Sequence, residues 1–295
     1  MHIRLVAAGV AACLLAAPAS AQESATLKKI KETNTISLGH RESSVPFSYY
    51  DDKQQVVGYS YDFQKKVVEA VKKELNLPNL QIKMTPVTSQ NRIPLVQNGT
   101  IDLECGSTTN NLERQKQVDF TTTVFIIGTR LLTKKDSGVK DFADLKGKNV
   151  VTTAGTTSEK LLRAMNDEKK MGMNVISAKD HGESFLTLES GRAVAFMMDD
   201  ALLAGERAKA RNQADWVIVG TAQSKEAYGC MLRKGDAGFK KLADGAISAA
   251  LKADGEAEFK KWFQAPIPPK GVNLNLPLSD DMKDLFKTPN DKAFQ

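Results

Sequence analysis

The most informative polar residues of the sequence lie in the segment that begins with Ser107-Thr108-Thr109 and continues to Arg114. Small hydroxyl side chains end a predicted strand, an arginine follows within about one turn of a predicted helix, and Val118-Asp119-Phe120-Thr121 comes next. Free backbone N–H groups at such a helix start, together with a guanidinium, can bind a carboxylate. The same spacing also suits a capped surface helix with a solvated arginine, so spacing alone leaves both interpretations open.

Other polar side chains also follow predicted strands. Arg41 comes after an apolar strand at 36–39, Thr157 after one at 149–153, and Asp199 after one at 193–197. In an open α/β sheet, ligands bind outside the carboxyl ends of the strands. We therefore expect these side chains to share one site with Arg114.

An acidic amino acid would suit this set of side chains. It carries two carboxylates and one ammonium, and each charge needs a fixed partner once it leaves water. The planar guanidinium of arginine donates two parallel hydrogen bonds to a carboxylate. An aspartate with a few oxygen acceptors can hold the ammonium.

The elements that position these residues alternate between strands and helices. Further strands are predicted at 80–84, 101–105, 216–219 and 227–233, and amphipathic helices at 63–75, around Arg92, at 161–165 and up to Phe263. This alternation predicts an α/β fold with mainly parallel sheets. The proline-containing tail, 266–295, is expected to run over the surface.

The N-terminus has the pattern of an export signal. A positive start at 1–4 precedes an apolar run at 5–17, and the small residues at 19–21 predict cleavage after Ala21. Lipoprotein processing at Cys13 is the less favoured alternative. We expect a mature protein in the periplasm that is soluble, because no later segment is long and apolar enough to span a membrane.

Charge and cysteine content narrow the function further. The net charge of +6 is modest and the lysines are dispersed, which argues against a nucleic-acid partner. Cleavage would leave Cys105 and Cys230, and two thiols in an oxidising compartment suggest one disulfide. With His40 and His181 as the only remaining histidines, we expect no metal site and no cofactor.

Four longer segments carry a family resemblance: 40–50, 88–99, 104–117 and 177–208. Together with the Thr-x-x-x-x-Arg pattern and the β/α order, they resemble the polar amino-acid binding proteins of ATP-driven bacterial importers, from about Leu27 to the C-terminus. The resemblance implies a two-lobed type II periplasmic-binding-protein fold with a two-crossover hinge. Lobe 1 would comprise 27–128 plus 221–295, and lobe 2 would comprise 129–220.

The resemblance also implies a role for each candidate residue. Arg114, Thr109 and Thr157 would bind the α-carboxylate of the ligand, and Asp199 with Ser107 would bind its ammonium. The side-chain carboxylate would be surrounded by Arg41, Ser89, Arg92 and His181. The expected ligand is L-glutamate or L-aspartate, and the expected partners are the membrane permease and ATPase subunits of an importer, with the binding protein itself a monomer.

Three other functions are weighed against this one. A binding protein for another anion, such as a dicarboxylate, would have no use for Asp199. A cyclohexadienyl dehydratase on the same scaffold would need an acid or base in the cleft, and we expect no enzyme here. A sensory module would normally be fused to a membrane helix. The chain has no GxxxxGK[ST] motif, so energy for import must come from a partner.

Overall fold

The computed structural model describes residues 24–294, so the predicted signal segment and Cys13 lie outside the described residues. Within this range, nine strands form one continuous sheet in the order β5-β1-β6-β12-β7-β10-β8-β9, and β11 pairs with β7. A small separate sheet has the order β2-β3-β4. No helix in this part of the chain is long and apolar enough to cross a membrane.

The strands are β1 Thr35–His40, β2 Ser43–Ser44, β3 Ser48–Tyr50, β4 Val56–Val57, β5 Gln81–Pro86, β6 Leu103–Glu104, β7 Val118–Lys134, β8 Asn149–Thr153, β9 Asn174–Ala178, β10 Ala195–Asp199, β11 Trp216–Val219 and β12 Lys225–Arg233. The α-helices are α1 Ala25–Thr33, α2 Tyr59–Leu75, α3 Arg92–Gln97, α4 Leu112–Gln115, α5 Thr157–Glu168, α6 His181–Glu189, α7 Asp200–Lys209, α8 Ala237–Phe263 and α9 Asp280–Lys287. Two 3-10 helices complete the described elements, η1 Phe142–Leu145 and η2 Gln213–Asp215.

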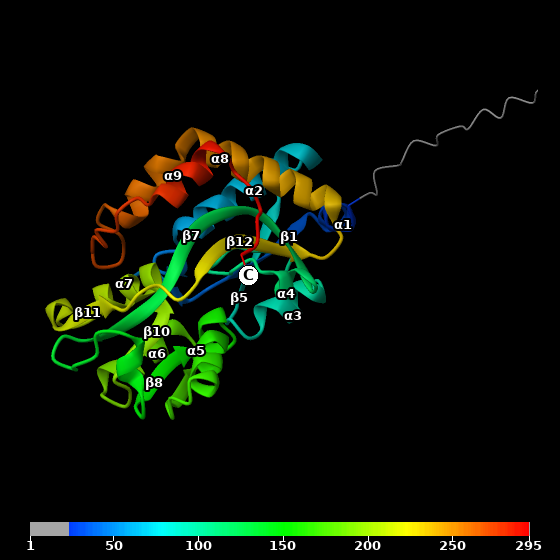
Figure 1. The fold of residues 1–295 in the computed structure, drawn as a ribbon. Helices are drawn as coiled ribbons and strands as arrows, with labels where there is room; N and C mark the ends of the chain where they lie inside the picture. Colours follow the sequence, from blue (N-terminus) through cyan, green and yellow to red (C-terminus); the bar gives the residue numbers. More distant parts are fainter. Residues whose placement is uncertain (1–23, 295) are drawn as a thin grey trace, which may run out of the picture.

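The long strand β7 divides the sheet into two halves. Up to Gly128 it pairs with β12, and from Thr129 onward it pairs with β10 and then β11. We call β5-β1-β6-β12-β7 the first sheet and β7-β10-β8-β9, with β11, the second sheet. Figure 1 shows β7 as a continuous green arc that runs from one half of the molecule into the other. The chain therefore crosses between the halves once along β7 and once between β11 and β12.

Each sheet contains the parallel pairs that the β/α alternation predicts. β1 is parallel to β5 and β6, and β8 is parallel to β9 and β10. The crossing strands add antiparallel pairs, because β7 runs opposite to β10, β11 and β12. The architecture is the predicted two-part α/β fold, with parallel strands outside and antiparallel crossing strands between them.

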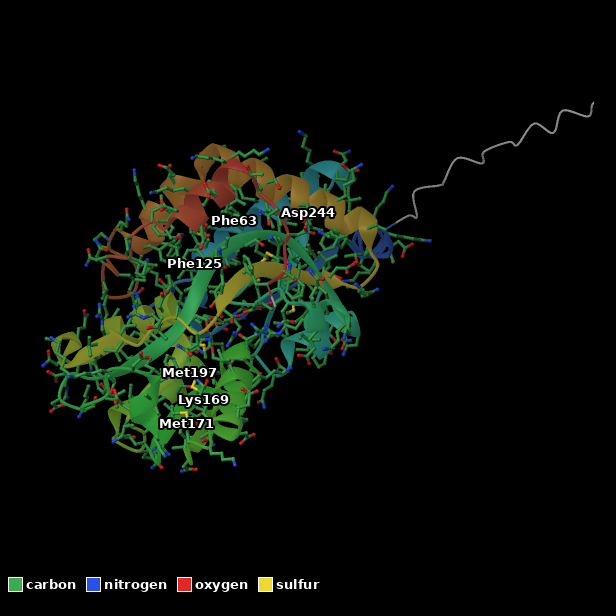
Figure 2. The ribbon with its side chains drawn as sticks, viewed as in Figure 1. Phe63, Phe125, Lys169, Met171, Met197 and Asp244 are labelled. Atoms are coloured by element: carbon green, nitrogen blue, oxygen red, sulfur yellow. A yellow bond between two sulfur atoms is a disulfide. The ribbon has the colours of Figure 1, made fainter. Side chains whose placement is uncertain are left out.

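Aromatic side chains form the core of the first half. Phe125 of β7 stacks on Phe259 and Phe263 of α8 at ring distances of 6.0 and 4.7 Å. Phe63 of α2 is also fully buried in this cluster (Figure 2). Buried rings of this size dominate the hydrophobic contribution to folding. They fix α2 and α8 against the first sheet, whose strand ends carry part of the candidate site.

The second half has a separate core that is rich in methionine. Met165, Met171, Met173 and Met197 pack with Leu162 against the second sheet, and Figure 2 places Met171 and Met197 within this half. Methionine fills irregular gaps because its side chain is unbranched and flexible. This methionine-rich core includes Met197 of β10, whereas the alternate β10 residues Phe196 and Met198 belong to the same buried cluster as the core of the first half, so the two halves also pack against each other.

The tail was predicted only to run over the surface, and it contains a helix that was not predicted from the sequence. This helix, α9, buries Met282, Leu285 and Phe286 against the first half. These apolar residues are spaced by three and one positions over only two turns, which is too short a pattern to identify in the sequence. The predicted disulfide is confirmed: Cys105, just after β6, is bonded to Cys230 of β12.

Candidate ligand-binding site

The candidate residues follow the carboxyl ends of strands from both sheets. In the first sheet, Arg41 follows β1 and Ser107 lies three residues beyond β6. In the second sheet, Asp199 ends β10, and Thr157 begins α5 after β8. The two sets of strand ends face one another across the seam between the halves, as hydrogen bonds between them show below.

Arg41 and Arg92 form the most deeply buried part of this seam, each with 1% of its surface exposed. Nη1 of Arg41 donates to Oγ of Ser107 at 3.4 Å. Nη1 of Arg92 donates to the carbonyl oxygen of Ser107 at 3.0 Å and to Oγ1 of Thr108 at 2.5 Å. The segment that follows β6, through Ser107 and Thr108, thus binds both guanidinium groups.

Burial makes it harder for these arginines to keep their charge. Desolvation, with a contribution from the neighbouring Arg92, lowers the pKa of Arg41 to about 10, and desolvation lowers the pKa of Arg92 as well. A buried carboxylate, Glu104, partly offsets this and also accepts a hydrogen bond from Thr108 at 2.8 Å. One carboxylate beneath two guanidinium groups leaves a local excess of positive charge, which favours an anion.

Four of the candidate residues have a buried polar atom without a hydrogen-bond partner among residues 24–294: Nη2 of Arg41, Oγ of Ser89, Nε of Arg92 and Nε2 of His181. Leaving a buried donor unpaired costs about 1–3 kcal/mol, and more for a charged group. These are the residues that the resemblance assigns to the side-chain carboxylate. The unpaired atoms are the kind of donors that an anion with several acceptor oxygens would satisfy.

His181 is held as a neutral side chain. It is the first residue of α6, and its Nδ1 lies 2.9 Å from Oγ1 of Thr153. Desolvation and the nearby charges of Arg41 and Arg92 lower its pKa well below 6.5. A neutral histidine can donate from Nε2 if Nδ1 accepts from Thr153.

Arg114 links the two halves directly. Asn111 caps the short helix α4 through a hydrogen bond from the backbone N–H of Arg114, which fixes the base of that side chain. Nη1 of Arg114 donates to the carbonyl oxygen of Thr109 at 3.0 Å, and Nη2 donates to that of Gly155 at 3.3 Å. The hydroxyls of Thr109 and Thr157 lie 3.5 Å apart across the same seam.

Asp199 is the acidic centre of the site. Its Oδ1 accepts hydrogen bonds from Thr129 at 2.9 Å and Ser158 at 3.4 Å, and its Oδ2 accepts one from the hydroxyl of Tyr228. Desolvation and the neighbouring carboxylate of Glu226 raise the pKa of Asp199 to about 7. An ammonium partner would relieve both effects, because it stabilises the ionised carboxylate.

Three buried residues of the site were not identified in the sequence: Glu104, Glu226 and Tyr228. Glu226 accepts a hydrogen bond from Thr157 at 2.9 Å, and Tyr228 donates to Asp199. A weak signal existed for Tyr228, which lies in the strand predicted at 227–233, but Glu226 shares its face only because β12 begins earlier, at Lys225. Only the pairing of β12 with β7 brings that face to the site.

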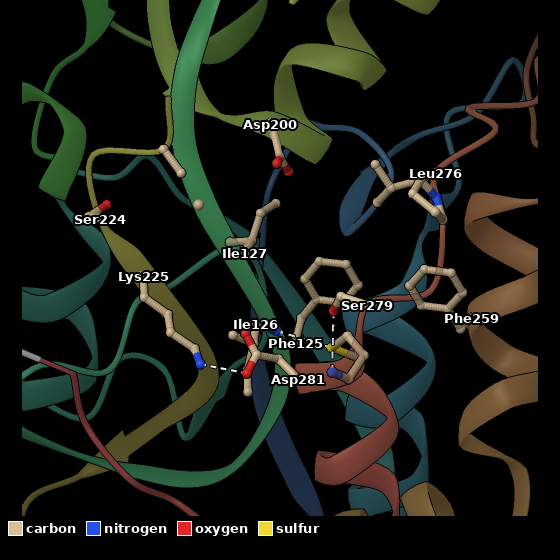
Figure 3. A pocket seen from close by; sticks show the side chains of 14 residues that line it. Phe125, Ile126, Ile127, Asp200, Ser224, Lys225, Phe259, Leu276, Ser279 and Asp281 are labelled. Carbon is tan, nitrogen blue, oxygen red and sulfur yellow. Dashed lines mark hydrogen bonds and ion pairs between the residues drawn. The ribbon is translucent and has the colours of Figure 1, made fainter. Parts of the chain in front are cut away.

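A separate surface pocket of about 370 Å³ lies beside the crossing strands. Figure 3 shows Phe125 and Ile127 of β7, Asp200 and Ser224 around it, and the pair of Lys225 with Asp281 at its rim. None of the nine candidate ligand residues lines it. Its walls are mostly apolar and its Lys225 is paired with Asp281, whereas the seam carries buried arginines with unpaired donor atoms, so the seam is the candidate site.

A fold of two α/β halves with a polar site between them is that of an extracellular solute receptor. The family model described as bacterial extracellular solute-binding proteins, family 3, matches residues 36–265, and the chain belongs to this family.

Among characterised relatives, an L-glutamate/L-aspartate-binding protein of Pseudomonas aeruginosa is 65% identical over 293 residues, 98% of this chain and 97% of that protein. A glutamate/aspartate import solute-binding protein of Salmonella typhimurium is 66% identical, and the match covers 99% of this chain and 96% of that protein. The structure of an ancestral arginine-binding protein bound to arginine has a TM-score of 0.70 and 29% identity, covering 78% of this chain and 98% of that one.

Proposed function

We propose that this protein captures L-glutamate or L-aspartate outside the cytoplasmic membrane and delivers it to an ATP-driven importer. The observation that carries the proposal is the charge arrangement of the seam. Three buried arginines, two of them with unpaired donor atoms, lie opposite a buried aspartate that three hydroxyl groups orient. Such an arrangement complements a molecule with two carboxylates and one ammonium.

Each candidate residue has a role in this proposal. Arg114, with Thr109 and Thr157, binds the α-carboxylate, and Asp199 with Ser107 binds the ammonium. Arg41, Ser89, Arg92 and His181 bind the side-chain carboxylate. The names of the two close relatives, which refer to glutamate and aspartate, support the same ligand.

The proposed moving units are lobe 1, residues 27–128 plus 221–295, and lobe 2, residues 129–220. The change in the partners of β7 between Gly128 and Thr129 supports this boundary. Contacts from Arg114 to Gly155 and from Glu113 to Lys160 link the lobes in a closed arrangement. A ligand that contacts both lobes stabilises the closed form by its difference in affinity for the two forms.

The wider setting follows from the proposed ligand and the family. Cleavage after Ala21 would release the mature chain into the periplasm, where the closed monomer would dock on the permease and ATPase subunits of the importer. The protein is proposed to bind its ligand without chemical change. The extracellular family and the import proteins among the relatives support this setting.

Calorimetric titration of the purified mature chain tests the proposal. Glutamate and aspartate should bind, and glutamine should bind at least about tenfold more weakly, because an amide leaves buried guanidinium charge uncompensated at a cost of roughly 2–5 kcal/mol. Succinate lacks the ammonium and should also bind weakly. Equal binding of succinate and glutamate would instead identify a dicarboxylate receptor, and turnover of prephenate would identify a dehydratase.

A further inference from the structure

Two carboxyl groups of the site are joined by a row of oxygen atoms. Oδ1 of Asp199 lies 2.9 Å from Oγ1 of Thr129. That oxygen lies 2.7 Å from Oγ of Ser224, which lies 2.6 Å from Oε1 of Glu226. All three distances are those of hydrogen bonds between oxygen atoms.

The number of hydrogens that these three contacts require shows whether a carboxyl group in the row is protonated. Each of the three contacts needs one hydrogen between its two oxygens. The hydroxyls of Thr129 and Ser224 supply one hydrogen each, and an ionised carboxylate supplies none. The third hydrogen must come from Asp199 or Glu226, so one of the two carboxyl groups carries a proton.

The surroundings of the row favour one shared proton rather than two or none. The two carboxylate oxygens outside the row accept bonds from elsewhere: Tyr228 donates to Oδ2 of Asp199, and Thr157 donates to Oε2 of Glu226. Ser158 donates to Oδ1 of Asp199, the oxygen that is in the row. The positive charges of Arg92 and Arg114 act on the pair, and Asp200 adds a negative charge next to Asp199. Two buried carboxylates this close repel each other when both are ionised, whereas the arginines oppose protonation of both.

The row lies at the crossing strands and has access to solvent. Asp199 ends β10 of the second sheet, Thr129 lies on β7, and Glu226 lies on β12 of the first sheet. Ser224 is partly exposed and lines the surface pocket beside these strands (Figure 3). A proton in the row can therefore reach solvent through Ser224 without passing the ligand.

We propose that Asp199 and Glu226 share one proton through Thr129 and Ser224, and that the ammonium of a bound amino acid displaces this proton to solvent. Before binding, the shared proton supplies the third hydrogen. After binding, an N–H of the ammonium replaces Thr129 as the donor to Asp199, the hydroxyl of Thr129 turns to Ser224, and Ser224 donates to Glu226. Two hydroxyl hydrogens then serve the two contacts that remain, and the contact between Asp199 and Thr129 is no longer a hydrogen bond. A water molecule accepts the released proton, and no bond of the ligand breaks. The inference rests on the proposed function, since it needs a ligand with an ammonium group.

Calorimetry in two buffers of different ionisation enthalpy measures the protons released. For the wild-type mature chain with glutamate, we expect close to one proton released at pH 6 and close to none at pH 8.5. Affinity should fall about tenfold between pH 8 and pH 6, because the pKa of Asp199 lies at about 7 in the free protein and falls on binding. His181 beside a bound carboxylate would take up protons, so the decisive quantity is a difference between variants.

Glu226→Gln is the main variant. The amide N–H can donate to Ser224 and so supplies the third hydrogen permanently. We expect less than half of the wild-type proton release at pH 6 and less than a threefold change in affinity between pH 8 and pH 6. The matched control, Glu69→Gln, replaces an exposed carboxylate on α2 and should behave as wild type.

Ser224→Ala breaks the row without changing a carboxyl group, and it should also reduce the release, while Ser224→Thr should restore it. Full release in both Glu226→Gln and Ser224→Ala would assign the proton to Asp199 alone and overturn the proposal, as would wild-type binding without any release. If glutamate does not bind at all, the proposed function fails separately. In that case infrared spectroscopy of the unliganded protein at pH 6 tests the shared proton. The band of a protonated carboxyl group should be present in the wild type and reduced in Glu226→Gln.

Discussion

Replacing Asp199 with asparagine should stabilise the unliganded protein at neutral pH while removing its affinity for amino acids. The pKa of Asp199 is about 7 in the folded protein, compared with 3.8 for an ordinary aspartate. Each pH unit of this difference corresponds to about 1.4 kcal/mol, so the full difference corresponds to about 4 kcal/mol. Asparagine is uncharged and avoids this cost.

The sign of the pH dependence follows from proton binding. Because the folded pKa is the higher one, the folded protein binds more protons than the unfolded chain between about pH 4 and pH 7. The free energy of unfolding of the wild type should therefore fall through this range by up to about 4 kcal/mol relative to Asp199→Asn, and the difference should stay constant above about pH 7. Groups that do not interact with Asp199 titrate alike in both proteins and cancel in the comparison.

Urea unfolding without ligand at pH 4.5, 6 and 8 measures this difference. The curves of the two proteins should approach each other at pH 4.5 and diverge at pH 8 in favour of Asp199→Asn. Saturating glutamate should then raise the stability of the wild type only. A difference between the proteins that does not change with pH would refute the argument, because it would mean that the Asp199 carboxyl does not titrate abnormally in the fold.

Three further changes have defined outcomes. Arg92→Met removes a buried guanidinium, so it should weaken glutamate binding at least about 30-fold and bring the affinity for glutamine within about threefold of that for glutamate. Calorimetry measures both affinities, and a retained preference for glutamate over glutamine would exclude Arg92 from the site. A methyl group at Gly205 would lie 2.2 Å from the carbonyl oxygen of Val45 across the seam. Glutamate should contract the wild type in small-angle scattering, and Gly205→Ala should prevent this contraction. Replacing both Cys105 and Cys230 with serine should lower the free energy of unfolding by about 3–5 kcal/mol, because the bond joins positions 125 residues apart, and a change below about 1 kcal/mol in denaturant unfolding would contradict this.

Local sequence patterns were sufficient to predict most of the helices and strands. The strands predicted at 149–153 and 216–219 coincide with β8 and β11. The helix predicted from its apolar face at 63–75 lies within α2, Tyr59–Leu75. The helix buries one side, which helical periodicity records, whereas β8 is buried on both faces and is recognised as a short run of β-branched residues.

The strand β7 could not be derived in this way. The sequence at 118–121 belongs to a motif, and local patterns predict no strand between 105 and 149, yet residues 118–134 form one strand. Its two ends pair with different sheets, so no single buried face runs along its length. The pairing partners lie up to 115 residues away, as Val118 and Arg233 do, and local patterns hold no record of them.

The sequence by itself determined the chemistry available to this protein: arginines, hydroxyls and one aspartate placed where strands end, and two cysteines able to form a bond. Side-chain type and position along a strand are local properties, and they suffice to predict which charges a site can offer. Only the tertiary structure decided how those charges act on one another. Glu104 beneath Arg92, and Glu226 joined to Asp199 through two hydroxyls, come from separate strands, and electrostatic energy depends on distance and burial that arise when those strands pack together.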